Sequence, residues 1–166
     1  MMENGKADTP MPKITPFLWF NQNAEEASEF YTSIFKESKI LDVQRLGGEG
    51  PGPKGSVMYT TFRLDGQEFM ALNGGPLFKF TEAVSFMVMC ENQAEVDRYW
   101  AALSEGGQES QCGWLKDRFG LSWQIVPTQF MQMMQDQDAG RFDAVMTALL
   151  GMQKIDIATL ERAYKP

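Results

Sequence analysis

The chain has 166 residues, of which 15 are basic and 22 acidic, and it contains no histidine. A chain of this length can bury a sizeable core as one domain or as two small units. The net charge of −7 argues against binding to a phosphate backbone, so we expect no nucleic-acid partner. No apolar run approaches the roughly 20 residues of a membrane span, and the N-terminus lacks a signal pattern. We therefore expect a cytoplasmic protein that does not act on membranes.

The two cysteines, Cys90 and Cys112, are far apart in the sequence and outside any CxxC spacing. A disulfide framework or a zinc knuckle would need more cysteines. We expect both to be buried or half-buried thiols.

Residues 1–13 are polar and proline-containing, which predicts a flexible leader. The apolar run at residues 14–20 predicts a strand. Asn23 is then expected to cap a helix, with Glu26 completing a capping box. The apolar stripe of that helix follows the i, i+3, i+4, i+7, i+8 spacing of one buried face: Ala27, Phe30, Tyr31, Ile34 and Phe35.

Residues 39–46 predict a weak strand, and the Gly- and Pro-rich residues 47–55 predict either a mobile surface loop or a lid over a cavity. Residues 57–64 and 68–73 alternate as strands do, and Asp65-Gly66 between them is typical of a two-residue hairpin turn. Residues 14–76 thus predict a first βαβββ module.

Residues 84–127 repeat this order. A strand is expected at residues 84–90, and Asn92 with Glu95 predicts a second capping box. Residues 112–117 and 121–127 predict a hairpin about Arg118-Phe119.

If Asp117 faces Gly120 in that hairpin, Trp114 lies opposite Trp123 on one face of the sheet. The helix of this module repeats that of the first at a constant offset. The first copy contains Asn23-Ala24-Glu25-Glu26-Ala27, Phe30-Tyr31 and Ile34, and the second contains Asn92-Gln93-Ala94-Glu95-Val96, Tyr99-Trp100 and Leu103.

Residues 128–166 lie outside the repeat and show a helical apolar pattern rich in methionine. We expect a C-terminal helical extension that packs on the sheet or on a second subunit.

Two tandem βαβββ modules resemble the vicinal oxygen chelate superfamily, which includes glyoxalase I, bleomycin-resistance proteins and extradiol dioxygenases. Within it the chain is similar to the PhnB-like subgroup, often labelled as a demethylubiquinone methyltransferase domain. The segments that carry this resemblance are Thr15-Pro16-Phe17-Leu18-Trp19-Phe20, Phe30-Tyr31, Leu72-Asn73-Gly74-Gly75-Pro76, Gly113-Trp114-Leu115-Lys116-Asp117, Gly120-Leu121-Ser122-Trp123-Gln124-Ile125-Val126-Pro127 and residues 152–163. The resemblance implies an α+β fold in which both modules form a curved mixed sheet around a cavity.

Metal-dependent members of the superfamily hold their ion with four inward side chains, one from the first and one from the last strand of each module. The resemblance places these positions, within about one residue, at Thr15, Ala71, Ser85 and Gln124. Hydroxyls, a methyl group and one amide are poor ligands for a divalent transition metal. We therefore expect no bound metal and no cofactor.

The subgroup's label alone does not imply that this chain is a methyltransferase. A Rossmann-type enzyme would show a Gly-rich loop that opens a helix, whereas residues 47–50 run into Pro51 and Pro53.

A curved sheet lined by aromatic and amide groups is typical of a small-molecule pocket. The expected ligand-binding residues are Trp19, Phe62, Asn73, Ser85, Trp114, Trp123 and Gln124, with Phe17 and Phe69 as further candidate walls. Ordinary core packing is the alternative for the tryptophans, and a turn role is the alternative for Asn73.

Two functions follow from these residues. The first is a metal-free small-molecule-binding protein of the glyoxalase/bleomycin-resistance type. The second is an enzyme, a lyase, isomerase or transferase, that acts on a small polar or carbonyl substrate with Gln124 and Asn73 as hydrogen-bond donors. A single βαβββ module is too small to close a cavity, and the tail needs a surface to pack on, so we also expect a homodimer.

Overall fold

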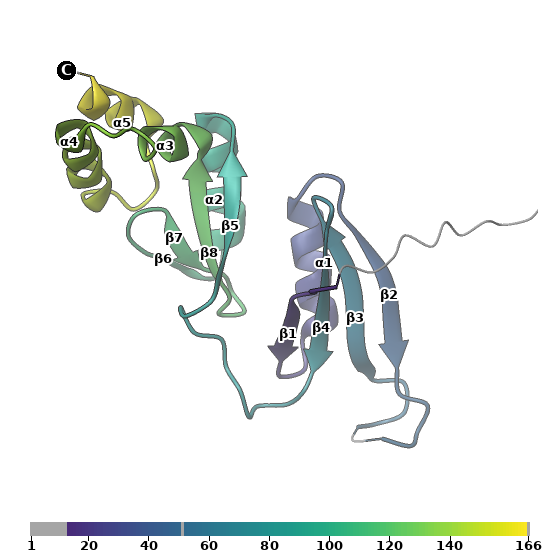
Figure 1. Cartoon of the computed structure of the whole chain (residues 1–166). Coiled ribbons are helices and arrows are strands. Elements are labelled where there is room, and N and C mark those ends of the chain that lie inside the picture. Colours follow the sequence, from purple (N-terminus) through teal and green to yellow (C-terminus); the bar gives the residue numbers. More distant parts are fainter. Residues whose placement is uncertain (1–12, 51, 166) are drawn as a thin grey trace, which may run out of the picture. The chain divides into compact units, whose positions relative to one another are not determined.

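The computed structural model describes residues 13–50 and 52–165, and it divides into two compact units that meet in sequence between Lys79 and Phe80. Each unit has its own four-stranded sheet with one helix packed against one face (Figure 1). The predicted α+β class with two βαβββ units and a helical tail is confirmed. A sheet that joins both units around a cavity stays a prediction, and the predicted leader lies, except for Lys13, outside the described residues.

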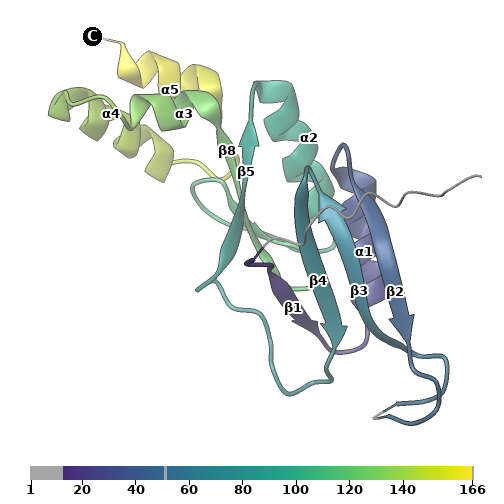
Figure 2. The ribbon, with the colours of Figure 1, turned by 45° about the vertical axis from the view of Figure 1, so that its right-hand side comes forward.

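In the first unit the sheet order is β1-β4-β3-β2, with β1 parallel to β4 and the other pairs antiparallel. The elements, drawn in Figures 1 and 2, are β1 (Phe17–Phe20), α1 (Ala24–Ile34), β2 (Lys39–Arg45), β3 (Val57–Leu64) and β4 (Gln67–Asn73). The β3–β4 turn is confirmed. Leu64 pairs with Gln67, and Asp65 and Gly66 both have positive φ, 45° and 83°, as a type I′ turn requires.

Alternation along β3 and β4 sorts the side chains of the first unit onto two faces. One face packs on α1, where Phe62 stacks on Tyr31 at 6.1 Å and on Phe69 at 5.4 Å between ring centroids. These rings are buried and form the centre of the core. The opposite side, which we call the first open face, carries Phe17, Trp19, Tyr59, Met70 and Leu72.

The start of α1 differs from the prediction. The Asn23 side chain makes no capping hydrogen bond. Instead the Oδ1 atom of Asn73, at the end of β4, accepts a hydrogen bond of 2.9 Å from the Ala24 amide. A residue 49 positions away in sequence thus satisfies one of the free amides at the helix start.

In the second unit the sheet order is β5-β8-β7-β6, again with only the outer pair β5 and β8 parallel. The elements are β5 (Ser85–Cys90), α2 (Gln93–Ser104), β6 (Gln108–Glu109), β7 (Trp114–Lys116) and β8 (Ser122–Pro127). Here the predicted cap is present. Asn92 Oδ1 accepts from the Glu95 amide at 3.0 Å, and the Glu95 carboxylate reaches back to the Glu91 amide.

The β7–β8 register differs from the prediction by one residue. Trp114 pairs with Gln124, and Leu115 pairs with Trp123. The turn holds three residues and not two, because the Asp117 amide donates to the Leu121 carbonyl, and Gly120 takes a positive φ of 87°. A shift of one residue turns a strand over, so Trp114 and Trp123 lie on opposite faces of the sheet.

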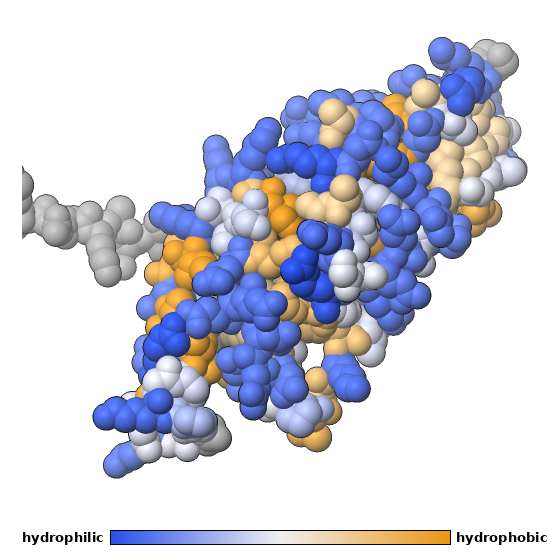
Figure 3. Space-filling model, turned by 180° about the vertical axis from the view of Figure 1, so that it is seen from behind, coloured by the Kyte–Doolittle hydropathy of each residue, from blue (hydrophilic) through white to orange (hydrophobic). Residues whose placement is uncertain are grey.

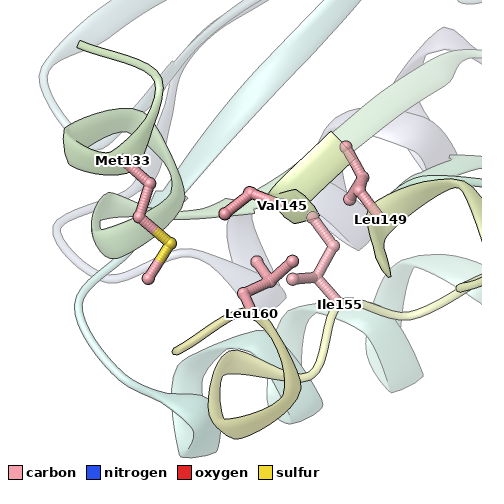
Figure 4. Packing of buried hydrophobic residues seen from close by; sticks show 5 residues of the cluster. All are labelled: Met133, Val145, Leu149, Ile155 and Leu160. Atoms are coloured by element: carbon pink, nitrogen blue, oxygen red, sulfur yellow. The ribbon is translucent and has the colours of Figure 1, made fainter. Parts of the chain in front are cut away.

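The tail forms the three helices α3 (Thr128–Met133), α4 (Ala139–Leu150) and α5 (Ile157–Tyr164), which confirms the predicted helical extension. Figure 4 shows the core that these helices share, built from Met133, Val145, Leu149, Ile155 and Leu160. The tail packs within the second unit (Figure 2) and does not form a separate body.

Backbone hydrogen bonds connect the tail to the residues that lead into β7. The amides of Cys112 and Gly113 donate to the carbonyls of Met152 and Gln153 at 2.9 and 2.7 Å. From α2, the amide group of Gln93 donates to the Ile155 carbonyl and accepts from the Ile157 amide.

The side seen in Figure 3 is mostly hydrophilic, with hydrophobic residues between the hydrophilic ones. Among the helices of the described residues, none is both long and apolar enough to cross a membrane.

Candidate functional site

The side of the second sheet that faces away from α2 gathers the most complete set of the predicted site residues. Strand alternation places α2 over Leu115, Trp123 and Ile125, which are all buried. We call the other side the second open face. The register of β5, β8 and β7 places on it Ser85, Met87, Met89, Ser122, Gln124, Val126, Trp114 and Lys116.

Gln124 lies at the centre of this face. Its Nε2 atom donates a hydrogen bond of 2.9 Å to Ser85 Oγ on the neighbouring strand. Its cross-strand partners are Met87 on one side and Trp114 on the other. The Ser85 hydroxyl hydrogen and the Gln124 carbonyl oxygen make no further hydrogen bond to the described residues. The pair therefore offers two donors, the Ser85 hydroxyl and the second N–H of Gln124, and one acceptor, the Gln124 carbonyl oxygen, to a third molecule.

Apolar side chains surround this polar pair. Met87 and Met89 are exposed by 47% and 43%, and Trp114 is half-buried. A pocket of about 450 Å³ lies beside Trp114. Its lining residues are Glu82, Gln108, Ser110, Gln111, Cys112, Trp114, Leu115 and Lys116.

Three residues of this region were not predicted from the sequence. Lys116 forms an ion pair with Glu82, and the hydroxyl of Ser122 is buried with no hydrogen-bond partner among the described residues. Ser122 is the register partner of both Ser85 and Lys116. Once the β7–β8 register is known, alternation alone places Ser122 and Lys116 on the same face as Gln124.

Trp123, predicted to bind ligand, lies on the other face. It is 3% exposed, and its Nε1 atom donates to Asp117 Oδ2 at 2.9 Å. The other oxygen of Asp117 accepts from the amides of Phe119 and Leu121. Trp123 and Asp117 therefore stabilise the hairpin and the core, and the prediction for Trp123 is corrected.

Two predicted ligand-binding residues of the first unit also have structural roles. Phe62 is fully buried between Tyr31 and Phe69, so it is not a wall of the open face. The amide group of Asn73 is used twice, since it accepts from Ala24 and donates to the Val57 carbonyl at 3.0 Å. Asn73 thus connects the start of α1 to β3 and β4, and its role as a ligand anchor stays a prediction.

Trp19 is half-buried on the first open face and is held by the segment after β4. Its Nε1 atom donates to the Gly75 carbonyl at 2.9 Å, and its ring meets Phe78 edge-on at 5.0 Å. A Cβ atom at Gly74 would lie 2.3 Å from the ring, so only glycine allows this packing. Trp19 keeps its predicted place on an open face, in the first unit.

The residues that the resemblance places at the metal positions do not have the donor groups that a divalent transition metal prefers. Ser85 and Gln124 supply a hydroxyl and an amide, and they already bond to each other. Ala71 is fully buried toward α1; its neighbour Met70 is the residue that occurs on the first open face. The remaining position, Thr15, precedes β1 and offers another hydroxyl. Among the described residues, no group of three or more Asp, Glu or Cys side chains is arranged to hold an ion.

The two thiols of the second unit and the buried carboxylate of the first unit have structural surroundings. Burial of Cys90 raises the pKa of its thiol to about 12, so the thiol stays protonated at neutral pH. The Cys112 thiol is half-buried and donates to the Leu149 carbonyl. Glu68, largely buried, is held by Arg63 at 2.9 Å.

Comparison with known proteins places this geometry in a family. A family model described as 3-demethylubiquinone-9 3-methyltransferase matches residues 12–126. A solved PhnB protein from Bacillus cereus, which carries the same methyltransferase description, is 40% identical, with 70% of this chain and 99% of that chain covered and a TM-score of 0.65. No curated protein matches the chain.

Two more distant structures share the fold. PA1353 from Pseudomonas aeruginosa is 24% identical, covers 70% of this chain and 97% of its own, and has a TM-score of 0.59. The fosfomycin resistance protein FosX from Mesorhizobium loti is 11% identical, with 69% and 90% covered and a TM-score of 0.50. The helices α3–α5 lie beyond the residues that the family model matches. The chain belongs to the family described as 3-demethylubiquinone-9 3-methyltransferase, within the PhnB-like subgroup of the vicinal oxygen chelate superfamily.

Proposed function

We propose that the protein binds a small molecule, without a metal, on the second open face. The observation that carries this proposal is the hydrogen-bonded pair of Gln124 and Ser85, set between Met87 and Trp114. A few placed polar groups among apolar and aromatic side chains are the composition of small-molecule sites. The superfamily fold supports a binding role of the glyoxalase/bleomycin-resistance type.

The neighbours of Gln124 favour binding over catalysis. General acid–base chemistry needs a titratable side chain within hydrogen-bond reach of the reacting group. On the adjacent strands, the residues that pair with Gln124 are Met87 and Trp114, and neither one titrates. A catalytic role would have to draw on Cys112, Glu82 or Lys116, which line the pocket beside Trp114.

The family's description suggests a methyltransferase, and the fold gives no support for a Rossmann-type cofactor cradle. Gly47 and Gly48 lie in the connection between β2 and β3, where no helix begins. A nucleotide-type cradle needs backbone amides at a helix start. We expect no binding of S-adenosylmethionine at physiological concentration. Calorimetry that gave a low-micromolar dissociation constant would restore methyl transfer as the leading function.

A thermal-shift screen against metabolites and planar drugs tests the proposal. A compound at 100 times its dissociation constant stabilises a protein by about 2.7 kcal/mol, which moves Tm by several degrees. The variant Gln124→Leu should lower the affinity for each hit by about tenfold, since it removes a hydrogen bond of order 1 kcal/mol and leaves Ser85 unpaired.

Gln132→Leu, at an exposed glutamine of α3, is the matched control and should bind as the wild type does. Hits that bind the Gln124 variant with undiminished affinity would show that the site lies elsewhere. Elemental analysis of tag-free protein is a second check. About one transition metal per chain, lost in Gln124→Ala, would overturn the metal-free proposal.

A further inference from the structure

The pocket beside Trp114 contains one cationic side chain among its lining residues, Lys116, which is paired with Glu82. The two partners differ in their surroundings. Glu82 comes from the connection before β5 and its side chain is 62% exposed, whereas Lys116 belongs to a sheet strand and is 34% exposed. Exposed ion pairs of this kind are weak, so another anion can displace the Glu82 carboxylate from the lysine.

A second observation, at the register partner of Lys116 on the next strand, is independent of the ion pair. Ser122, only 1% exposed, has a hydroxyl group without a hydrogen-bond partner among the described residues. Native structures leave few buried polar groups unpaired, and each one calls for an explanation such as a ligand or an ordered water. The hydroxyl lies on the strand between those that carry Ser85 and Lys116, and it shares their face.

The strand order connects the two observations. Ser122 on β8 is the register partner of Lys116 on β7, and Glu82 comes from the connection that leads into β5, the strand on the other side of β8. Directly opposed residues on neighbouring strands have Cβ atoms about 5 Å apart. One small group can therefore contact the Lys116 amine and the Ser122 hydroxyl at the same time.

We propose that the ligand of this site carries a carboxylate, which replaces the Glu82 carboxylate on Lys116 and accepts a hydrogen bond from Ser122. The apolar, planar part of such a ligand lies on Trp114, and the pair of Gln124 and Ser85 binds a further polar group. Glu82 acts as an internal stand-in that keeps the lysine neutralised while no ligand is bound. This inference rests on the proposed function and names the chemical class of its ligand.

The test compares benzoate with its neutral analogue benzamide, by ligand-detected NMR titration of the full chain. Wild-type protein should bind benzoate more tightly than benzamide. Glu82→Gln removes the competing carboxylate and should tighten benzoate binding about threefold to fivefold, the range expected for loss of an exposed ion pair. Lys116→Met should weaken benzoate binding about tenfold and change benzamide binding less than twofold.

Lys154→Met is the matched control, because it breaks an exposed ion pair with Asp97 that lies outside the pocket lining. Ser122→Ala separates a ligand contact from a structural role. It removes an unpartnered buried hydroxyl, so the melting temperature should stay level or rise. The same substitution should nevertheless weaken benzoate binding severalfold.

Two results would overturn the inference. Equal affinity for benzoate and benzamide in wild type and Glu82→Gln would exclude a carboxylate ligand while leaving small-molecule binding in place. Absence of benzoate binding even to Glu82→Gln would exclude Lys116 as an anion site, and the proposed function would then depend on the compound screen alone.

Discussion

Buried polar side chains of the second unit are of two kinds. Asp117 is 3% exposed, and its two oxygens accept hydrogen bonds from two backbone amides and from the indole of Trp123. A buried carboxylate with this many donors fixes a backbone turn. The hydroxyl of Ser122, five residues further on, has no hydrogen-bond partner in the part of the chain that the structure describes. The paired group accounts for the fold of the hairpin, and the unpaired group marks the place where a ligand is expected.

Asp117→Ala should lower the free energy of unfolding by about 2–4 kcal/mol, because two amides and one indole N–H lose a charged acceptor in a buried place. Asp117→Asn should have a smaller effect. The asparagine carbonyl oxygen can still accept from both backbone amides, and only the hydrogen bond from the Trp123 N–H is lost, because the asparagine NH₂ group is itself a donor. Urea denaturation measures both. Asp143→Ala, at an exposed position of α4, should change stability by less than about 0.5 kcal/mol. Equal stability of Asp117→Ala and wild type would contradict the role of this carboxylate.

The two thiols should react at very different rates with an alkylating agent at pH 8. Desolvation is the main reason that the Cys90 pKa is raised to about 12, so only a trace of thiolate forms and burial blocks access as well. Cys112 is half-buried at the rim of the pocket. Mass spectrometry should find Cys112 labelled first, and Cys90 labelled only after denaturant is added. Native labelling of Cys90 at the rate of Cys112 would be the opposite result.

At the scale of elements, turn chemistry decided which registers the sequence could predict. Asp65-Gly66 encodes a two-residue turn, and the β3–β4 register followed correctly from it. The turn after Asp117 has no such signature. Its third residue, Gly120, was assigned to the pairing, and the error of one residue moved Trp123 to the wrong face. The short strand β6 could not be located, because two residues carry no alternation.

Contacts between residues that are distant in sequence could not be predicted either, because no local pattern indicates which residues meet. The cap of α1 comes from Asn73 and not from the adjacent Asn23, and nothing local in the sequence indicates which amide reaches the helix. The Ser85–Gln124 pair was predicted as two separate candidates. Its geometry depends on the parallel pairing of β5 and β8, which are separated by a helix and two strands.

The Gln93 side chain connects α2 to the start of α5, and replacing it should destabilise α5. The variant Gln93→Ala leaves the Ile155 carbonyl and the Ile157 amide without their side-chain partner. We expect a loss of about 1–2 kcal/mol in stability and faster hydrogen exchange in residues 155–165 than in β8. Gln132→Ala on α3 is the control. Unchanged exchange throughout the tail of Gln93→Ala would contradict this role.

At the scale of the whole molecule, the repeat supplies two similar units, and the tail adds a third layer of packing to only the second. Several large apolar side chains stay exposed in the chain. They include Ile14, Phe17, Leu77 and Phe78 in the first unit and Val84, Met87, Met89 and Leu150 in the second. Contiguous apolar patches on a protein surface mark sites of association, and these side chains are the candidates for such a patch on each unit.

We propose a homodimer with two-fold symmetry, to which the tail helices contribute. Light scattering should give twice the chain mass at about 10 μM, in line with an interface of about 2,000 Å² in total. Leu150→Glu places a charge at a 66% exposed apolar position of α4 and should shift the equilibrium toward monomer. Thr147→Glu, one turn earlier and also exposed, is the control. A monomer mass for the wild type would refute the dimer.

The central claim is that the second open face binds a small molecule through Gln124 and Ser85. Chemical-shift mapping of backbone, glutamine and indole signals, with the strongest hit of the compound screen, tests it most directly. The account predicts that the perturbed signals gather at Ser85, Met87, Trp114, Lys116 and Gln124, and that they disappear in Gln124→Leu. Perturbations that gather instead on the tail helices or on α1, and that persist in the variant, would contradict it.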